Sequence, residues 1–271
     1  MIKRKGARSA KEIPGEILQQ LNSGEIETAN LVEWLAVDQK LLLENLLIKH
    51  NRTDYLDPIL NKINQLKKQT VNTINEAIGT IFELTHENED FSFLEIICHH
   101  KADLVRCWAT YTIGKNQNLH IEQTLQQIQK FAADKHFGVR EICWMAVRPK
   151  IKDNLTKSIE ILSEWTANED ENIRRFTTES TRPRGVWCEH IEDLKQNPEL
   201  ALPILETLKS DSSKYVQDSV GNWLNDASKT QPGFVQEICQ RWSLESDSKA
   251  TQYIIKKALR TLNKEIILYR V

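Results

Sequence analysis

A segment that recurs along the C-terminal two-thirds of the chain restricts the folds that this sequence can adopt. In each copy, a β-branched residue and then a long or charged polar residue follow a short turn and open a helix. The β-branched residues stand at intervals of 34, 34, 43 and 35 residues: Val105, Val139, Ile173, Val216 and Thr251. Periods of roughly 20–50 residues indicate stacked structural repeats.

A second amphipathic segment precedes each of the later copies. Its large apolar anchor lies eight or nine residues upstream of the β-branched position: Phe131, Trp165, Leu208 and Trp242. Around these anchors the apolar residues have helical spacing, as in Leu125, Ile128 and Phe131. Polar turns such as Asp134-Lys135-His136 supply residues that cap helices and interrupt them. Each repeat is therefore predicted to be a helix, a turn and a helix.

The predicted fold is all-α, a right-handed α-α superhelix of HEAT-like helix pairs. Only 9 Gly and 7 Pro occur in 271 residues, which disfavours sheets with frequent tight turns. Residues 12–100 have less regular helical patterns, and clear repeats run from about 100 to 265. Since each helix pair buries its apolar face against its neighbours, and no Pro, Gly or Ser-rich linker interrupts the chain, one domain over residues 1–271 is expected. Pro183, Gly185 and Pro198 indicate an inserted loop in the longest interval.

Charge and cysteine content narrow the functional classes. The formal net charge is -2, so contact with nucleic acid requires a local basic patch. Five widely spaced cysteines without a C-x-x-C pair suggest neither a disulfide framework nor a zinc site. The basic N-terminus, Met1–Lys11, lacks the apolar h-region of a secretory signal, and no later apolar stretch has the length of a membrane span. We therefore expect a cytoplasmic monomer with reduced thiols that uses no metal and no cofactor.

The second helices of the repeats are rich in arginine and tryptophan. In a stack of helix pairs these helices line the concave side, so their exposed residues form a common surface. Guanidinium groups bind phosphate bidentately, and aromatic rings pack on sugars, bases or a cationic lesion. The candidate DNA-binding residues are Arg106, Arg140, Trp144, Arg148, Arg174, Arg175, Arg182, Arg184, Trp187, Trp223, Lys256, Lys257 and Arg260, with Lys264 beyond them.

A structural interpretation of the same residues stays open. Tryptophans at helical spacing more often belong to a core than to a binding surface. Arginines in solenoids also form salt bridges between repeats, here with acids such as Glu141 and Glu179. The clustering of these residues favours the binding interpretation.

Four segments resemble the AlkC branch of the bacterial AlkC/AlkD family of DNA alkylation repair proteins: Lys5–Arg8, Glu25–Asp38, Asn172–Trp187 and Tyr215–Lys229. The Arg-Pro-Arg stretch at 182–184 is the most specific part. The resemblance implies a HEAT-like solenoid that binds double-stranded DNA and excises cationic N-alkylated bases such as 3-methyladenine or 7-methylguanine without flipping them. It also implies a short form that lacks a C-terminal immunoglobulin-like domain. Some relatives have no glycosylase activity and bind branched DNA.

The chemistry of this reaction calls for a carboxylate. A base alkylated on nitrogen is already cationic, so it leaves without a general acid, and the sugar becomes oxocarbenium-like. A carboxylate beside the sugar would stabilise that charge and position a water molecule. Glu141 is the first candidate because it opens the second helix of a central repeat, and Asp226 and Glu179 follow. For each of them the alternative is an ion pair with a nearby arginine.

Three functions therefore compete at this level. The leading hypothesis is a monofunctional DNA glycosylase for alkylated purines. The second is a non-catalytic HEAT-repeat protein that binds branched or damaged DNA. The third is a protein-interaction scaffold, which is the commonest use of HEAT arrays.

Overall fold

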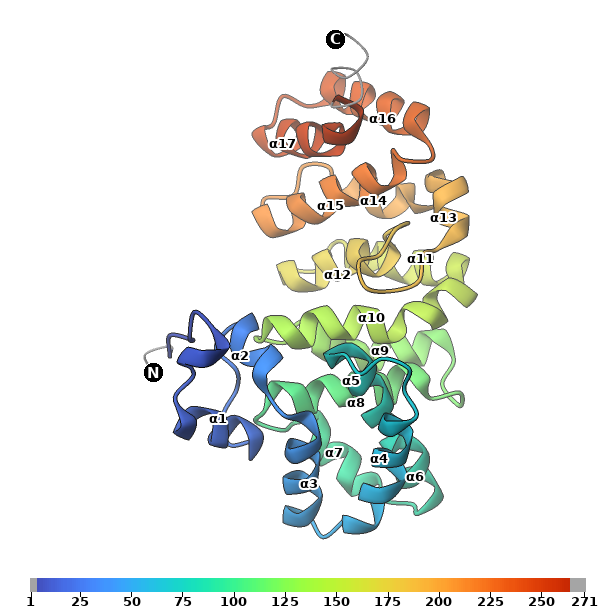
Figure 1. Ribbon diagram of the computed structural model, residues 1–271. Coiled ribbons are helices and arrows are strands. Elements are labelled where there is room, and N and C mark those ends of the chain that lie inside the picture. The colour runs from blue at the N-terminus through green and yellow to red at the C-terminus, as the bar shows by residue number, and fades with distance from the viewer. Residues whose placement is uncertain (1–3, 264–271) are drawn as a thin grey trace. The chain divides into compact units, whose positions relative to one another are not determined.

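The computed structural model describes residues 4–263, and every regular element in that range is a helix (Figure 1). The predicted all-α class is therefore confirmed. Two compact units divide the chain: unit 1 contains residues 4–119 and 134–147, and unit 2 contains residues 120–133 and 148–263. Helix α10 (Phe137–Asp153) contributes its first part to unit 1 and its last part to unit 2. A single domain over 1–271 stays a prediction, and Lys264 lies outside the described residues.

Unit 1 is built around helix α8, which is buried from Asp103 to Gly114. Two glycines permit this close packing. A Cβ at Gly79 would lie 2.3 Å from the Cβ of Tyr111, and one at Gly114 would lie 2.3 Å from the backbone oxygen of Ala146. The other elements of unit 1 are η1 (Ala10–Glu12), α1 (Gly15–Asn22), α2 (Leu31–Ala36), α3 (Gln39–Lys49), η2 (Thr53–Tyr55), α4 (Leu56–Asn64), α5 (Val71–Ile78), α6 (Ile81–Glu87) and α7 (Phe91–Cys98), besides α8 (Asp103–Lys115) itself.

Unit 1 also holds a partly buried imidazole, which makes its stability depend on pH. Burial, and then the nearby charges of Lys49, His50 and Arg106, lower the pKa of His100 to about 4. A histidine in an unfolded chain has a pKa of about 6.5. Between these two pKa values the histidine is protonated in the unfolded chain but neutral in the folded chain. The free energy of unfolding should therefore fall as the pH drops from about 6.5 to about 4. His100→Gln should flatten this slope in urea titrations at several pH values. His99→Gln serves as the control, because His99 is exposed. An unchanged slope in His100→Gln would contradict the assignment of this pH dependence to His100.

Unit 2 consists of two layers of helices (Figure 1). In the second layer α12 packs on α15, and α15 packs on α17. The first layer contains α9 (Ile121–Ala132), α11 (Leu155–Trp165), α14 (Leu202–Leu208) and α16 (Pro232–Glu245); the second contains α12 (Glu171–Thr181), α15 (Lys214–Ala227) and α17 (Lys249–Ala258). The predicted insertion comprises an irregular loop at 182–191, the short helix α13 (Glu192–Gln196) and η3 (Pro198–Ala201).

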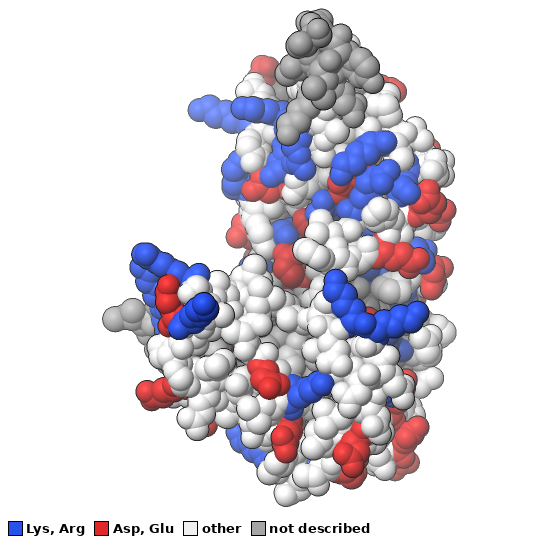
Figure 2. Space-filling view, in the orientation of Figure 1, with Lys and Arg blue, Asp and Glu red and all other residues white. Residues whose placement is uncertain are grey.

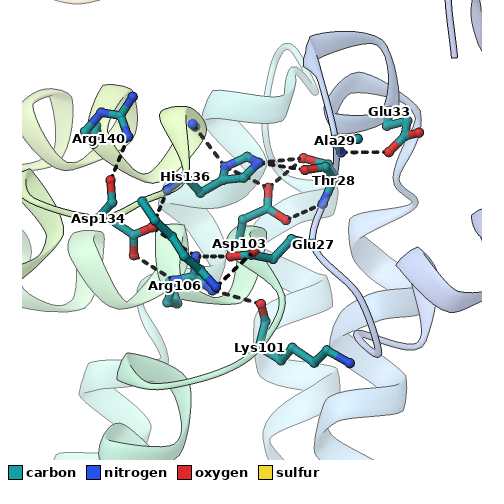
Figure 3. Close-up of polar contacts among 12 residues, drawn as sticks. Glu27, Thr28, Ala29, Glu33, Lys101, Asp103, Arg106, Asp134, His136 and Arg140 are labelled. Carbon is teal, nitrogen blue, oxygen red and sulfur yellow. Dashed lines mark hydrogen bonds and ion pairs between the residues drawn. The ribbon is translucent and has the colours of Figure 1, made fainter. Parts of the chain in front are cut away.

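The polar residue of the recurring segment fastens its own turn. Arg106, Arg140, Arg174 and Gln217 each donate a hydrogen bond to the carbonyl oxygen six residues earlier, at 2.7–2.8 Å. Two of the arginines also bind an aspartate of the next turn through Nε and Nη2: Arg106 binds Asp134 (Figure 3), and Arg174 binds Asp211. These bonds supply a structural reason for the repeat, since they close each turn and join it to the next.

Candidate nucleic-acid interface

Polar side chains line one side of α12, α15 and α17 and of the residues that directly follow each helix in unit 2. On each helix the stripe follows the helical spacing of three or four residues. We name this surface the second-helix face and define it by Glu171, Arg175, Glu179, Arg182, Lys214, Tyr215, Asp218, Asn222, Asp226, Lys229, Lys249, Tyr253, Lys256, Lys257 and Arg260.

Side chains of neighbouring helices touch across this face. The guanidinium carbon of Arg175 on α12 lies 4.2 Å from the ring centroid of Tyr215 on α15. Arg260, two residues after the end of α17, donates from Nη1 to Oδ1 of Asn222 on α15 at 2.8 Å. Gly221 lets α17 approach, because a Cβ at this position would lie 2.8 Å from the Cβ of Lys257. The stripes of the three helices therefore lie on one side of unit 2.

Positive charge exceeds negative charge on this face. The residues that define it include eight Lys or Arg and four Asp or Glu, although the whole chain has a formal net charge of -2. Figure 2 shows Lys and Arg side chains gathered over the α15 and α17 region, with fewer acidic ones between them. Such a local excess of cations is what a surface that binds a phosphate backbone requires.

Two of the acids share a single arginine. The Arg182 guanidinium binds Oδ2 of Asp226 through Nε at 2.9 Å and Nη2 at 2.5 Å, and it binds Oε2 of Glu179 through Nη1 at 3.3 Å. Ser219 donates to the other oxygen of Glu179 at 2.8 Å, and Lys229 binds the other oxygen of Asp226 at 2.9 Å. We call Glu179, Arg182, Asp226 and Lys229 the carboxylate cluster.

The carboxylate cluster is almost closed to solvent. Burial lowers the pKa of Arg182, but the charges and hydrogen bonds of Glu179 and Asp226 outweigh it, and the net pKa is raised. Both carboxylates are nearly buried, whereas the side chain of Lys229 is 42% exposed. Asp226 is therefore the carboxylate of the cluster that is paired with an exposed cation.

The loop at 182–191 presents an exposed indole. The side chain of Trp187 is 83% exposed, and its backbone has a φ of 65°, a conformation that non-glycine residues rarely adopt. Non-glycine residues in such conformations cluster at ligand contacts and active sites, which makes Trp187 a candidate contact residue. Val186 beside it is also exposed. Arg184 lies partly buried in the same loop, and its Nε has no hydrogen-bond partner among residues 4–263.

A buried arginine holds this loop in place. Arg148 is 2% exposed, and its guanidinium donates to the carbonyl oxygens of Ser180 at 2.9 Å, Glu189 at 3.0 Å and Arg182. Burial lowers the pKa of Arg148. The backbone of the loop passes so close to Arg148 that a Cβ at Gly185 would lie 3.1 Å from the guanidinium carbon. Arg148 therefore fixes the end of α12 and the loop, and its donors point inward.

Several other candidates from the sequence lie in the interior. Trp144 and Trp223 are buried; the indole of Trp144 donates to Glu141 at 3.1 Å, and that of Trp223 to the backbone oxygen of Thr181 at 3.0 Å. Arg106 and Arg174 hold turns, as described above. For these residues the geometry favours the structural interpretation, because their polar groups bind within the protein. Of the tryptophans proposed to bind DNA, Trp187 is the exposed one.

The three candidate carboxylates are divided between the two units. Glu141 belongs to the part of α10 in unit 1, whereas Glu179 and Asp226 belong to the carboxylate cluster of unit 2. Reasoning from sequence missed Lys214 and Tyr253, whose ammonium group and ring are in contact on the second-helix face. The spacing of Tyr253, Lys257 and Arg260 on one helical stripe was the signal that could have found this surface.

No helix within residues 4–263 is both long enough and apolar enough to cross a membrane. This covers all of the chain that the structure describes.

Comparison with known proteins found a matching family model for the C-terminal part of the chain. Residues 141–262 match the family model described as "DNA alkylation repair enzyme". The curated protein YhaZ of Bacillus subtilis (strain 168), whose description is "Uncharacterized protein", is 37% identical over 146 residues. That alignment covers 54% of this chain and 39% of YhaZ, so the chain matches about two-fifths of this relative.

Two solved structures share the fold. The Pseudomonas fluorescens alkylpurine DNA glycosylase AlkC, bound to DNA that contains an abasic site analogue, superposes with a TM-score of 0.66 at 21% identity, over 96% of this chain and 66% of that one. AlkD2 from Streptococcus mutans superposes with a TM-score of 0.56 at 22% identity, over 76% of this chain and 97% of that one. At these identities the similarity shows the common fold, and the predicted fold class of HEAT-like helix pairs is confirmed.

Proposed function

We propose that this chain is a DNA repair glycosylase of the AlkC branch of the DNA alkylation repair enzymes. It binds duplex DNA and hydrolyses the N-glycosidic bond of cationic purines such as 3-methyladenine or 7-methylguanine, without flipping the base. The observation that carries this proposal is the carboxylate cluster on a positively charged second-helix face, inside the region that matches the family model.

The cationic lesion explains why this arrangement suits the reaction. An alkylated purine needs no proton to leave, so the protein has to stabilise the sugar as it becomes positive. In our proposal Asp226 supplies this negative charge from its oxygen beside Lys229, while Glu179 is held from the interior by Ser219. Trp187 would lie against the cationic nucleotide, since an aromatic face attracts a cation. Glu141 and Glu179 remain candidates for the same role.

Release of the damaged base tests the proposal directly. The purified chain is incubated with duplex DNA that has been methylated at purine nitrogens, and free bases are separated by chromatography. We expect 3-methyladenine or 7-methylguanine to accumulate with time, and unmethylated duplex to release nothing. If methylated DNA also releases no base above the spontaneous rate, the enzymatic proposal fails.

A non-catalytic DNA-binding protein is the second candidate. One observation favours it: both carboxylates of the cluster are paired with cations, which is an ordinary structural use of such groups. The same assay separates the two functions when it is combined with a gel-shift measurement on the methylated duplex. DNA binding without base release would support the second candidate. If the chain neither binds DNA nor releases a base, the interaction-scaffold hypothesis is favoured.

Two exposed cations in and just after α17 are expected to contribute phosphate contacts. Lys256 and Arg260 are exposed, and charge removal in Lys256→Gln and Arg260→Gln should weaken DNA binding regardless of base sequence. Each variant should reduce the slope of log K against log salt by about 1. Fluorescence anisotropy at several salt concentrations measures this slope.

Lys157→Gln is the matched control for these variants, because Lys157 is exposed on α11 in the other layer of unit 2. A loss of affinity in the control as large as in the Lys256 and Arg260 variants would remove the basis for choosing the second-helix face.

A further inference from the structure

An open pocket of about 570 Å³ lies in unit 1, apart from the residues used above for catalysis or for the second-helix face. Three segments form its walls: the end of α3, the end of α7 with the turn that follows it, and the connection after α1. The polar side chains in its lining are Glu25, Lys49, His50, His99, His100 and Lys101. Its size is in the range of about 300–1,000 Å³ that is usual for small-molecule sites.

The lining is rich in nitrogen donors. Two ammonium groups, from Lys49 and Lys101, stand against the one carboxylate of Glu25, and three imidazoles add further N–H groups. The described residues contain no ion-pair partner for either lysine. This composition suits an anion with several acceptor oxygens, since ammonium and imidazole N–H groups form charge-assisted hydrogen bonds to phosphate.

The pocket wall is held in a fixed shape. The backbone N–H of Ala102 donates to Nδ1 of His100 at 3.1 Å, so the proton of the neutral ring is on Nε2, which has no acceptor among the described residues. Arg106 donates to the backbone oxygens of His100 and Lys101, both at 2.8 Å, and Figure 3 shows its bond to Lys101. On the opposite wall Gly24 has a φ of 72°, and a Cβ there would lie 3.0 Å from Cε1 of His100.

We infer that this pocket binds a phosphate group, held by Lys49 and Lys101 with hydrogen bonds from the histidines of its lining. The phosphate can be a free phosphate or a phosphodiester of a DNA backbone, since both present the same oxygens. The inference does not depend on the proposed glycosylase activity, and it holds for a protein that releases no base.

The cations also have a structural alternative. Lys49 and His99 lie at the C-terminal ends of α3 and α7, where positive charge offsets the helix dipole. A purely structural role predicts that loss of charge lowers stability and leaves anion binding unchanged. The two roles therefore differ in a binding measurement.

Histidine side-chain resonances provide that measurement. The full chain, labelled at histidine, is titrated with inorganic phosphate, and chloride at matched ionic strength serves as the blank. We expect saturable shifts of the His99 and His100 rings, and an affinity about tenfold lower in Lys49→Gln combined with Lys101→Gln. The matched control is Lys62→Gln, an exposed lysine outside the pocket. Thermal unfolding verifies that each variant is folded.

A short unmodified duplex forms the second arm and separates the two sources of phosphate. If the duplex moves the same resonances while inorganic phosphate does not saturate, and the double variant weakens this effect, the pocket binds a backbone phosphodiester. The inference is overturned if neither probe shifts the rings, or if Lys62→Gln weakens binding as much as the double variant does.

Discussion

Asp226→Asn is expected to lower the rate of base release from methylated duplex DNA by about 10²–10³-fold while DNA affinity stays close to that of the unchanged chain. The substitution keeps the size of the side chain and one oxygen for Arg182, but it removes the negative charge that would stabilise the sugar cation. Single-turnover kinetics at saturating protein measure the chemical step, and anisotropy on the same duplex measures affinity.

The other two carboxylates provide matched controls. Glu179→Gln and Glu141→Gln remove the same charge, from the interior side of the carboxylate cluster and from α10 respectively. We expect smaller losses of rate from both. If Asp226→Asn releases base at the unchanged rate while Glu141→Gln abolishes release, the catalytic carboxylate belongs to α10 and our choice is wrong.

Arg148→Met is expected to lower the free energy of unfolding by about 3–5 kcal/mol. Methionine approximates the length of the side chain, but it leaves the carbonyl oxygens of Ser180, Arg182 and Glu189 without the donors that Arg148 supplies. Urea titration followed by circular dichroism measures the loss. Limited proteolysis should also show earlier cleavage within 182–191, because Arg148 holds that loop to the end of α12.

Arg241→Met is the control for this change. Arg241 is 47% exposed and pairs with Glu206 and Glu245 on the surface, where such pairs contribute about 0–1 kcal/mol. If Arg148→Met costs no more than this control, the Arg148 contacts do not determine the stability of the loop.

The helix pairs could be predicted from sequence because burial produces a periodic pattern. Val105, Val139 and Val216 are all completely buried, so the positions that define the repeat are core positions. The polar residue after each of them was harder to interpret. Its spacing places it near a solvent-facing turn, but it does not reveal that Arg174 turns back to a carbonyl six residues earlier and binds Asp211.

The tryptophans illustrate the same limit. Trp223 and Trp187 are both large and both were proposed to bind DNA, but one is fully buried and the other is 83% exposed. The difference depends on the path of the loop at 182–191 around Arg148, and such a contact between distant residues leaves no periodic signal. The carboxylate cluster was also only partly predictable, since its ion pair joins residues 44 positions apart.

The central claim is that the second-helix face binds the DNA duplex, and lysine footprinting tests it most directly. The chain is acetylated with and without saturating duplex, and each lysine is quantified by mass spectrometry. We predict that Lys214, Lys229 and Lys256 lose reactivity when DNA is bound, while Lys130 and Lys157 on the other layer of unit 2 keep theirs. Protection of Lys130 and Lys157 instead, with the first three lysines unchanged, would contradict the claim.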